Sequence, residues 1–112
     1  MAITNVGITG TSSASPTTIY SSSGSNAITS IIICNTGNSA INLTLYAVPS
    51  GKSPSANPET TIVSALPIAA TETLSLDQEK LVLANGDVIS GIASSAYSAG
   101  SGLVVTVSTL AV

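Results

Sequence analysis

Apolar and polar side chains alternate with a period of two along much of this chain, which is typical of β-strands with one buried face. The alternation is cleanest over 40–48, where Ile41, Leu43 and Leu45 share one face and Asn42, Thr44 and Tyr46 share the other. Two further segments, 71–76 and 103–112, show the same pattern, and no helical period persists for three turns. The chain is therefore expected to be all-β.

The remaining strands are expected at 2–9, 17–20, 27–35, 60–66, 81–83 and 88–95, between turns rich in Gly, Ser, Pro and Asn. Segment 27–35 is almost continuously apolar, which predicts a strand covered on both faces. The short turn 35–38 joins it to 40–48, and this pair is predicted to form a hairpin. Segment 49–58 holds three prolines and is predicted to be an exposed loop.

Eight to nine short strands in 112 residues predict a single-domain antiparallel β-sandwich, jelly-roll-like or Ig-like. Ile, Val and Thr are abundant, and their branched side chains suit a pleated sheet. Residues 1–26 are expected to supply an N-terminal arm and the first strands, and 27–112 the body of the sandwich.

Only seven side chains carry a charge, and the net charge is −3. Two lysines and no arginine cannot neutralise a phosphate backbone, so no nucleic-acid partner is expected. No apolar run reaches membrane-spanning length, and no basic segment precedes an apolar one at the N-terminus. We therefore expect neither a membrane partner nor a secretory signal.

Candidate chemistry is scarce because the chain contains no histidine, which excludes Ser-His-Asp and Cys-His nucleophiles. Cys34 is the only cysteine, so it cannot form an intrachain disulfide, and its apolar run predicts a small buried hydrophobe. A reactive thiol would need a cationic neighbour. We expect no enzyme activity, no catalytic residue, no cofactor and no small-molecule substrate.

Asp77 and Glu79, with Asp87 nearby, could supply oxygen ligands for Ca²⁺, and solvated carboxylates beside a turn are the favoured interpretation. No metal site is therefore expected. Segment 51–53, Gly-Lys-Ser, reads as the end of a phosphate loop, but Tyr46 stands where an earlier glycine is required and Pro49 intervenes. The glycosylation acceptor pattern at 42–44 falls within a predicted strand.

From 27 to 112 the chain resembles a family of small virion structural proteins of tailed phages. The resemblance is carried by five segments in a fixed order: Ile31-Ile32-Ile33-Cys34-Asn35-Thr36, the run from Ile41 to Gly51, Ile68-Ala69-Ala70-Thr71-Glu72-Thr73, the run from Leu81 to Ile89, and Val105-Thr106-Val107. The first 25 residues depart from the pattern with a Ser/Thr/Gly-rich lead-in. The resemblance implies a β-sandwich, with no catalytic residues to carry over.

The resemblance and the low charge together predict a non-enzymatic structural protein of the virion, assembled in the host cytoplasm. The leading expectation is a capsid decoration (cement) protein, a homo-oligomer that stabilises the head shell by contacting the major capsid protein or other virion proteins. Segments 1–26 and 49–58 are its expected contact elements. The alternative is a tail, neck or fibre component. A lesser alternative is a carbohydrate-binding module, for which Tyr20, Tyr46 and Tyr97 are the only aromatic rings.

Overall fold

The computed structural model describes residues 2–76 and 81–112. Within these ranges the chain forms nine strands and one 3₁₀ helix. In chain order these are β1 (Ala2–Gly7), β2 (Thr17–Ser21), β3 (Asn26–Asn35), β4 (Ile41–Val48), η1 (Pro58–Thr60), β5 (Thr61–Ile68), β6 (Thr73–Leu76), β7 (Leu81–Leu83), β8 (Val88–Ala93) and β9 (Leu103–Ala111). No helix among the described residues is long and apolar enough to cross a membrane.

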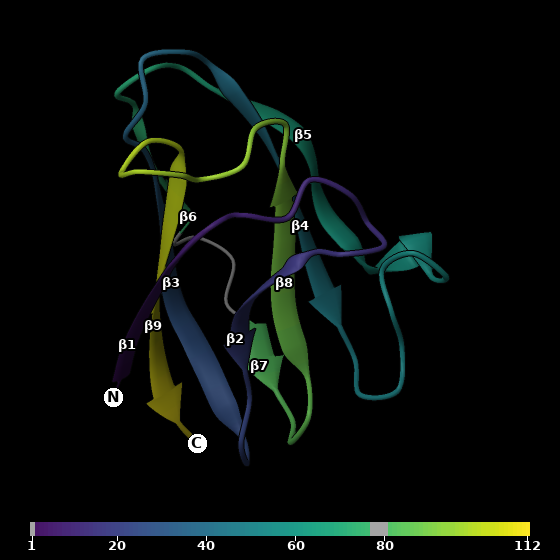
Figure 1. Ribbon diagram of the computed structural model, residues 1–112. Helices are drawn as coiled ribbons and strands as arrows, with labels where there is room; N and C mark the ends of the chain where they lie inside the picture. Colours follow the sequence, from purple (N-terminus) through teal and green to yellow (C-terminus); the bar gives the residue numbers. More distant parts are fainter. Residues whose placement is uncertain (1, 77–80) are drawn as a thin grey trace.

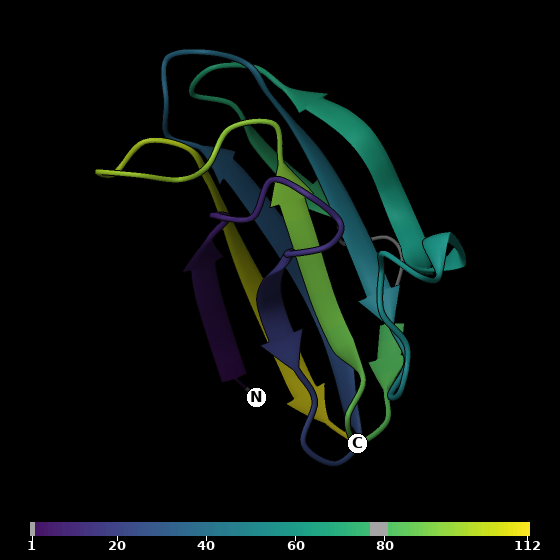
Figure 2. The same ribbon diagram turned by 45° about the vertical axis from the view of Figure 1, so that its right-hand side comes forward.

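The strands build two antiparallel sheets that pack face to face, which confirms the predicted single-domain β-sandwich (Figures 1 and 2). One sheet has the order β1-β9-β3-β6, with β7 beside another part of β3, and the other has the order β2-β8-β4-β5. We call them the five-stranded and the four-stranded sheet. If β6 and β7 count as one interrupted edge strand, the strand order is that of a jelly roll.

The core lies between the sheets and is aliphatic. Ile33, Val105 and Leu43 are fully buried in it, as the period of two predicts for their strands. Leu74 and Leu76 of β6 face the same way and are half-buried at the edge. Alternation along β4 and β9 therefore identified the core-facing residues correctly.

The predicted hairpin between 27–35 and 40–48 is wrong. β3 pairs with β6, β7 and β9, whereas β4 pairs with β5 and β8, so residues 36–40 carry the chain from one sheet to the other. Each strand's apolar face meets the other across the core instead of lying beside it in one sheet. Sequence-adjacent strands in a jelly roll commonly cross between sheets in this way.

Two expectations about burial also change. β3 is covered on its inner face, but Ile32 on its outer face is 41 % exposed, so the strand is not covered on both faces. Tyr46 points away from the core cluster, as predicted, yet it is only 5 % exposed. Loop 49–58 is largely exposed, as expected.

Candidate functional site

The crossover between the sheets is held by one buried amide, that of Asn35. Its Nδ2 donates to the carbonyl oxygens of Ser39 (2.9 Å) and Ile68 (3.1 Å), and its Oδ1 accepts from the backbone N–H of Gly37 (2.9 Å). The side chain is completely buried, and the three bonds satisfy most of its capacity. Asn35 thus fixes the path of the chain from β3 toward β4.

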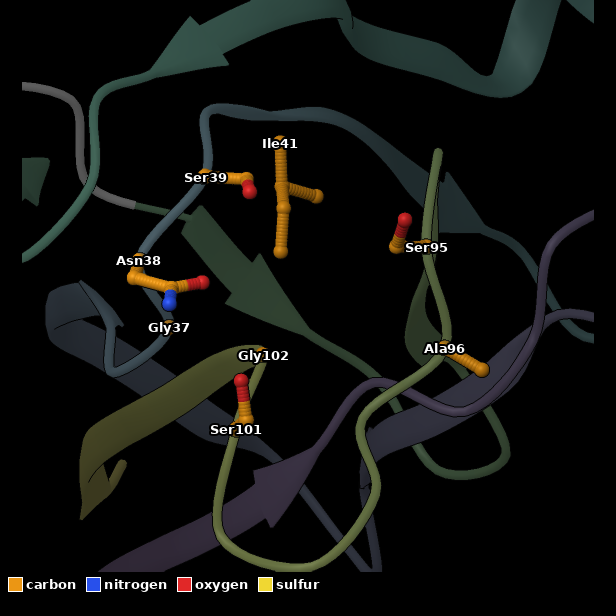
Figure 3. Close-up of a pocket in the computed structure, with 8 residues that line it drawn as sticks. All are labelled: Gly37, Asn38, Ser39, Ile41, Ser95, Ala96, Ser101 and Gly102. Atoms are coloured by element: carbon orange, nitrogen blue, oxygen red, sulfur yellow. The ribbon is translucent and has the colours of Figure 1, made fainter.

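A small hollow opens at the end of the sandwich where this crossover meets the loop between β8 and β9 (Figure 3). Asn38 and Ser39 approach it from the crossover, and Ser95, Ala96 and Ser101 from the facing loop. The two loops are joined by the Thr36 hydroxyl, which donates to the carbonyl oxygens of residues 100 and 102 at 2.9 and 3.1 Å.

The chemistry of this hollow is limited to hydroxyls, one amide and backbone groups. Its volume is about 140 Å³, whereas sites for drug-sized ligands usually span roughly 300–1,000 Å³. No side chain that lines it titrates near neutral pH. The hollow can order water, but it offers neither a nucleophile–base pair nor a stacking surface for a sugar ring.

The larger feature is the outer face of the five-stranded sheet. One row across its middle runs Asn5, Thr106, Ile32 and Ser75, on β1, β9, β3 and β6. These residues point outward because their neighbours along the strands, such as Ile33, point into the core. The row therefore consists of three short polar side chains and one large apolar side chain, that of Ile32.

The rows on either side have the same character. Toward the crossover lie Val104, Cys34 and Thr73, and Ile3 lies beside Ser108 at the other side. The bulge in β3 between residues 28 and 30 keeps the face continuous. Below it the row of Leu110, Ala27 and Val82 closes the face at β7.

No charged side chain among the described residues lies on this face. The four that the structure describes, Lys52, Glu59, Glu72 and Asp87, all belong to loops, turns or η1. We call the outward side of the five-stranded sheet, with the rows above, the uncharged face. It combines exposed Ile3 (70 %) and Val82 (68 %) with hydroxyl-bearing residues.

The opposite outer face, that of the four-stranded sheet, is partly covered by the chain itself. Tyr46 and its cross-strand partner Ser90 are buried there. Thr60 of η1, an element close to β4, is buried as well. The hydroxyls of Ser90 and Thr60 have no hydrogen-bond partner in the structure. A salt bridge of 3.6 Å between Lys52 and Glu59 joins loop 49–58 to η1. Tyr46 and Ser90 are thus more deeply buried than Ile32 on the uncharged face.

An apolar groove of about 310 Å³ lies between the open edges of the two sheets, lined by Ile31, Ile62, Val63, Leu76 and Leu81. Ile62 and Val63 belong to β5, the edge of the four-stranded sheet. Residues 77–80, which join β6 to β7, fall outside the described residues.

The residues singled out from the sequence do not gather into one site. Cys34 has a free thiol and is half-buried on the uncharged face, paired with Val104 and Thr73, so the expected core position is wrong. The alternation places Asn35, and not Cys34, in the interior, because the inward positions of β3 are 31, 33 and 35.

Asp87 serves as a turn-capping residue. Its Oδ1 accepts from the N–H of Ser50 (3.0 Å) and its Oδ2 from the N–H of Ala84 (2.9 Å). Asp77 and Glu79, the other two candidate calcium ligands, lie outside the described residues. The described part of the chain contains no group of three or more His, Cys, Asp or Glu side chains placed to hold a metal.

The other candidates are dispersed as well. Tyr20 packs against the core from β2, and the Tyr97 ring lies so close to Gly7 that a Cβ there would be 2.5 Å from Tyr97 Cδ1. Segment 51–53 lies in the exposed turn after β4, and segment 42–44 lies within β4. The tyrosines therefore belong to separate packing environments.

Sequence reasoning missed Asn35 and the uncharged face. A signal for Asn35 exists, because Asn followed two residues later by Gly is typical of an Asx turn, and the Gly37 N–H bond has that form. No family model, no curated protein and no solved structure matches this chain.

Proposed function

We propose that this chain is a non-enzymatic structural protein of a tailed-phage virion that decorates the capsid shell. The proposal begins from the sequence resemblance, and the observation that carries it is the uncharged face. An outer sheet surface without charges and with short hydroxyl side chains costs little desolvation and little side-chain entropy when another protein covers it.

The arrangement of the rest of the molecule supports the same role. The described charged side chains lie in turns and loops at the periphery, where assembly leaves them in water. Segments 10–16 and 49–58 project from the sheets as loops, and we assign the contact with the capsid protein to them. Jelly rolls serve in virions and in lectins alike, so the fold alone does not decide between these classes.

The decisive experiment compares particles with and without the protein. Particles that lack it should expand or leak their genome at a lower temperature than complete particles, and adding the purified protein back should restore the difference. Genome release can be followed with a DNA-binding dye during heating. Equal release temperatures with and without the protein would contradict the shell-stabilising role.

Copy number separates the shell from the tail. A decoration protein should be present in hundreds of copies per particle, whereas a tail, neck or fibre component should be present in about a dozen or fewer. Quantitative mass spectrometry of purified virions, with the major capsid protein as internal standard, measures this ratio. A low ratio would move the assignment to the tail.

A further inference from the structure

We propose that the uncharged face is an isologous self-association surface, which packs against the same face of a second copy of this chain. The inference deepens the proposed function, on which it rests for its biological setting, by naming the partner of this face. Its physical basis is independent of any particle, and three properties of the face support a second copy as the occupant.

The first property is size. β3 and β9 have ten and nine residues, β1 has six, and β6 and β7 have four and three. With about 3.4 Å per residue along a strand and about 4.8 Å between strands, the face offers about 500 Å² per copy, roughly a tenth of the 5609 Å² surface of the chain. Two copies would bury about 1,000 Å² in total, which is the size that a specific interface needs at least.

The second property is charge. A partner recognised by charge would require charges on this face, and the described residues supply none. Each copy carries a net charge of −3, so association between copies is opposed wherever charged groups meet. On the uncharged face two copies can meet without placing like charges of the described residues in contact.

The third property is the arrangement of side chains. In an isologous contact both copies use the same patch, so each residue of the patch on one copy meets a residue of that patch on the other copy. The central row places Ile32 between Thr106 and Ser75, so a large apolar side chain is flanked by short ones. Two such faces can interdigitate as the sheets of a sandwich do, at about 30°.

The test uses two variants of opposite charge at the centre of the face. Wild-type protein should sediment as a dimer at micromolar concentrations, and Ile32→Lys and Ile32→Glu should each weaken dimerisation by about 100-fold or more, because two like charges are buried together. An equimolar mixture of the two variants should recover the dimer, because their charges then pair across the interface. Analytical ultracentrifugation measures all four samples.

Asn42→Lys is the matched control, because it adds the same charge to an exposed position on the outer face of the four-stranded sheet. It should leave the dimer unchanged. Circular dichroism melting confirms that each variant is folded, and Thr106→Lys replaces Ile32→Lys if the latter is not. A monomeric wild type, a dimer that survives both Ile32 variants, or a mixture that fails to reassociate would each overturn the proposal.

The two proposals fail separately. A dimer that responds to Ile32 as described, in particles whose heat stability does not depend on the protein, would leave the self-association intact and remove the decoration role. A monomeric wild type that nevertheless raises the release temperature of particles would do the reverse.

Discussion

At the scale of single residues, the most consequential side chain is a buried polar one. Asn35 is completely buried, and its three hydrogen bonds connect β3, the crossover and the end of β5. A buried polar group is costly unless its partners are all present, and removing it also leaves those partners unpaired.

We expect Asn35→Ala to lower the free energy of unfolding by about 3 kcal/mol or more, because the Ile68 carbonyl and the Gly37 N–H both lose their partner inside the protein. Urea denaturation followed by circular dichroism measures the change. Asn38→Ala, in the same crossover but exposed, should change it by less than about 0.5 kcal/mol. Equal effects of the two substitutions would show that the amide network is not important.

At the scale of elements, alternation predicted which side of a strand is buried but not which strand lies beside it. The inward positions of β4 and β9 follow directly from the period of two. The pairing of strands does not follow from the period, because a short connection can close a hairpin or carry the chain across the core, and both leave the same face of each strand buried. The choice depends on long-range pairs, such as β3 with β9, that no local pattern contains.

The same scale explains why the site was harder to predict than the fold. Apolar residues in a strand are expected to be inside, so the sequence predicts that Ile32 and Cys34 lie in a covered strand. Their exposure follows from the sheet having no layer on its outer side, which is a property of the whole arrangement. Tyr46 is the opposite case, because its side chain faces away from the core cluster and is nevertheless buried.

Which face of β4 points into the core can be tested by placing one charged side chain on either face of the strand. Leu43→Asp should destabilise the domain by at least about 4 kcal/mol, because it buries an unpaired carboxylate among aliphatic side chains. Thr44→Asp should cost less than about 1 kcal/mol, because the Thr44 hydroxyl already accepts a bond from the Ala65 N–H at 3.0 Å, a role that a carboxylate can take over. Thermal melting distinguishes the two variants. Equal melting temperatures would contradict the placement of Leu43 in the core and of Thr44 on the outer face.

At the scale of the whole molecule, the few charged side chains are unevenly distributed over the surface. The described charged groups lie at the periphery of a sandwich with one outer face partly covered and the other open. In a protein that stays monomeric, an open face with exposed Ile3 and Val82 favours aggregation, since so few charges oppose it. In a protein that assembles, the same face is a partner surface, and this difference is measurable in solution.

Cys34 provides a reporter for that difference, because it lies half-buried on the uncharged face. A second copy packed on this face would cover the thiol, so its reaction rate with a soluble disulfide reagent should fall as the protein concentration rises through the dimerisation range. In Ile32→Lys the rate should be independent of concentration. The comparison is made within each protein, because a lysine beside a thiol changes the absolute rate. A wild-type rate that stays constant across that range would place the second copy elsewhere on the molecule.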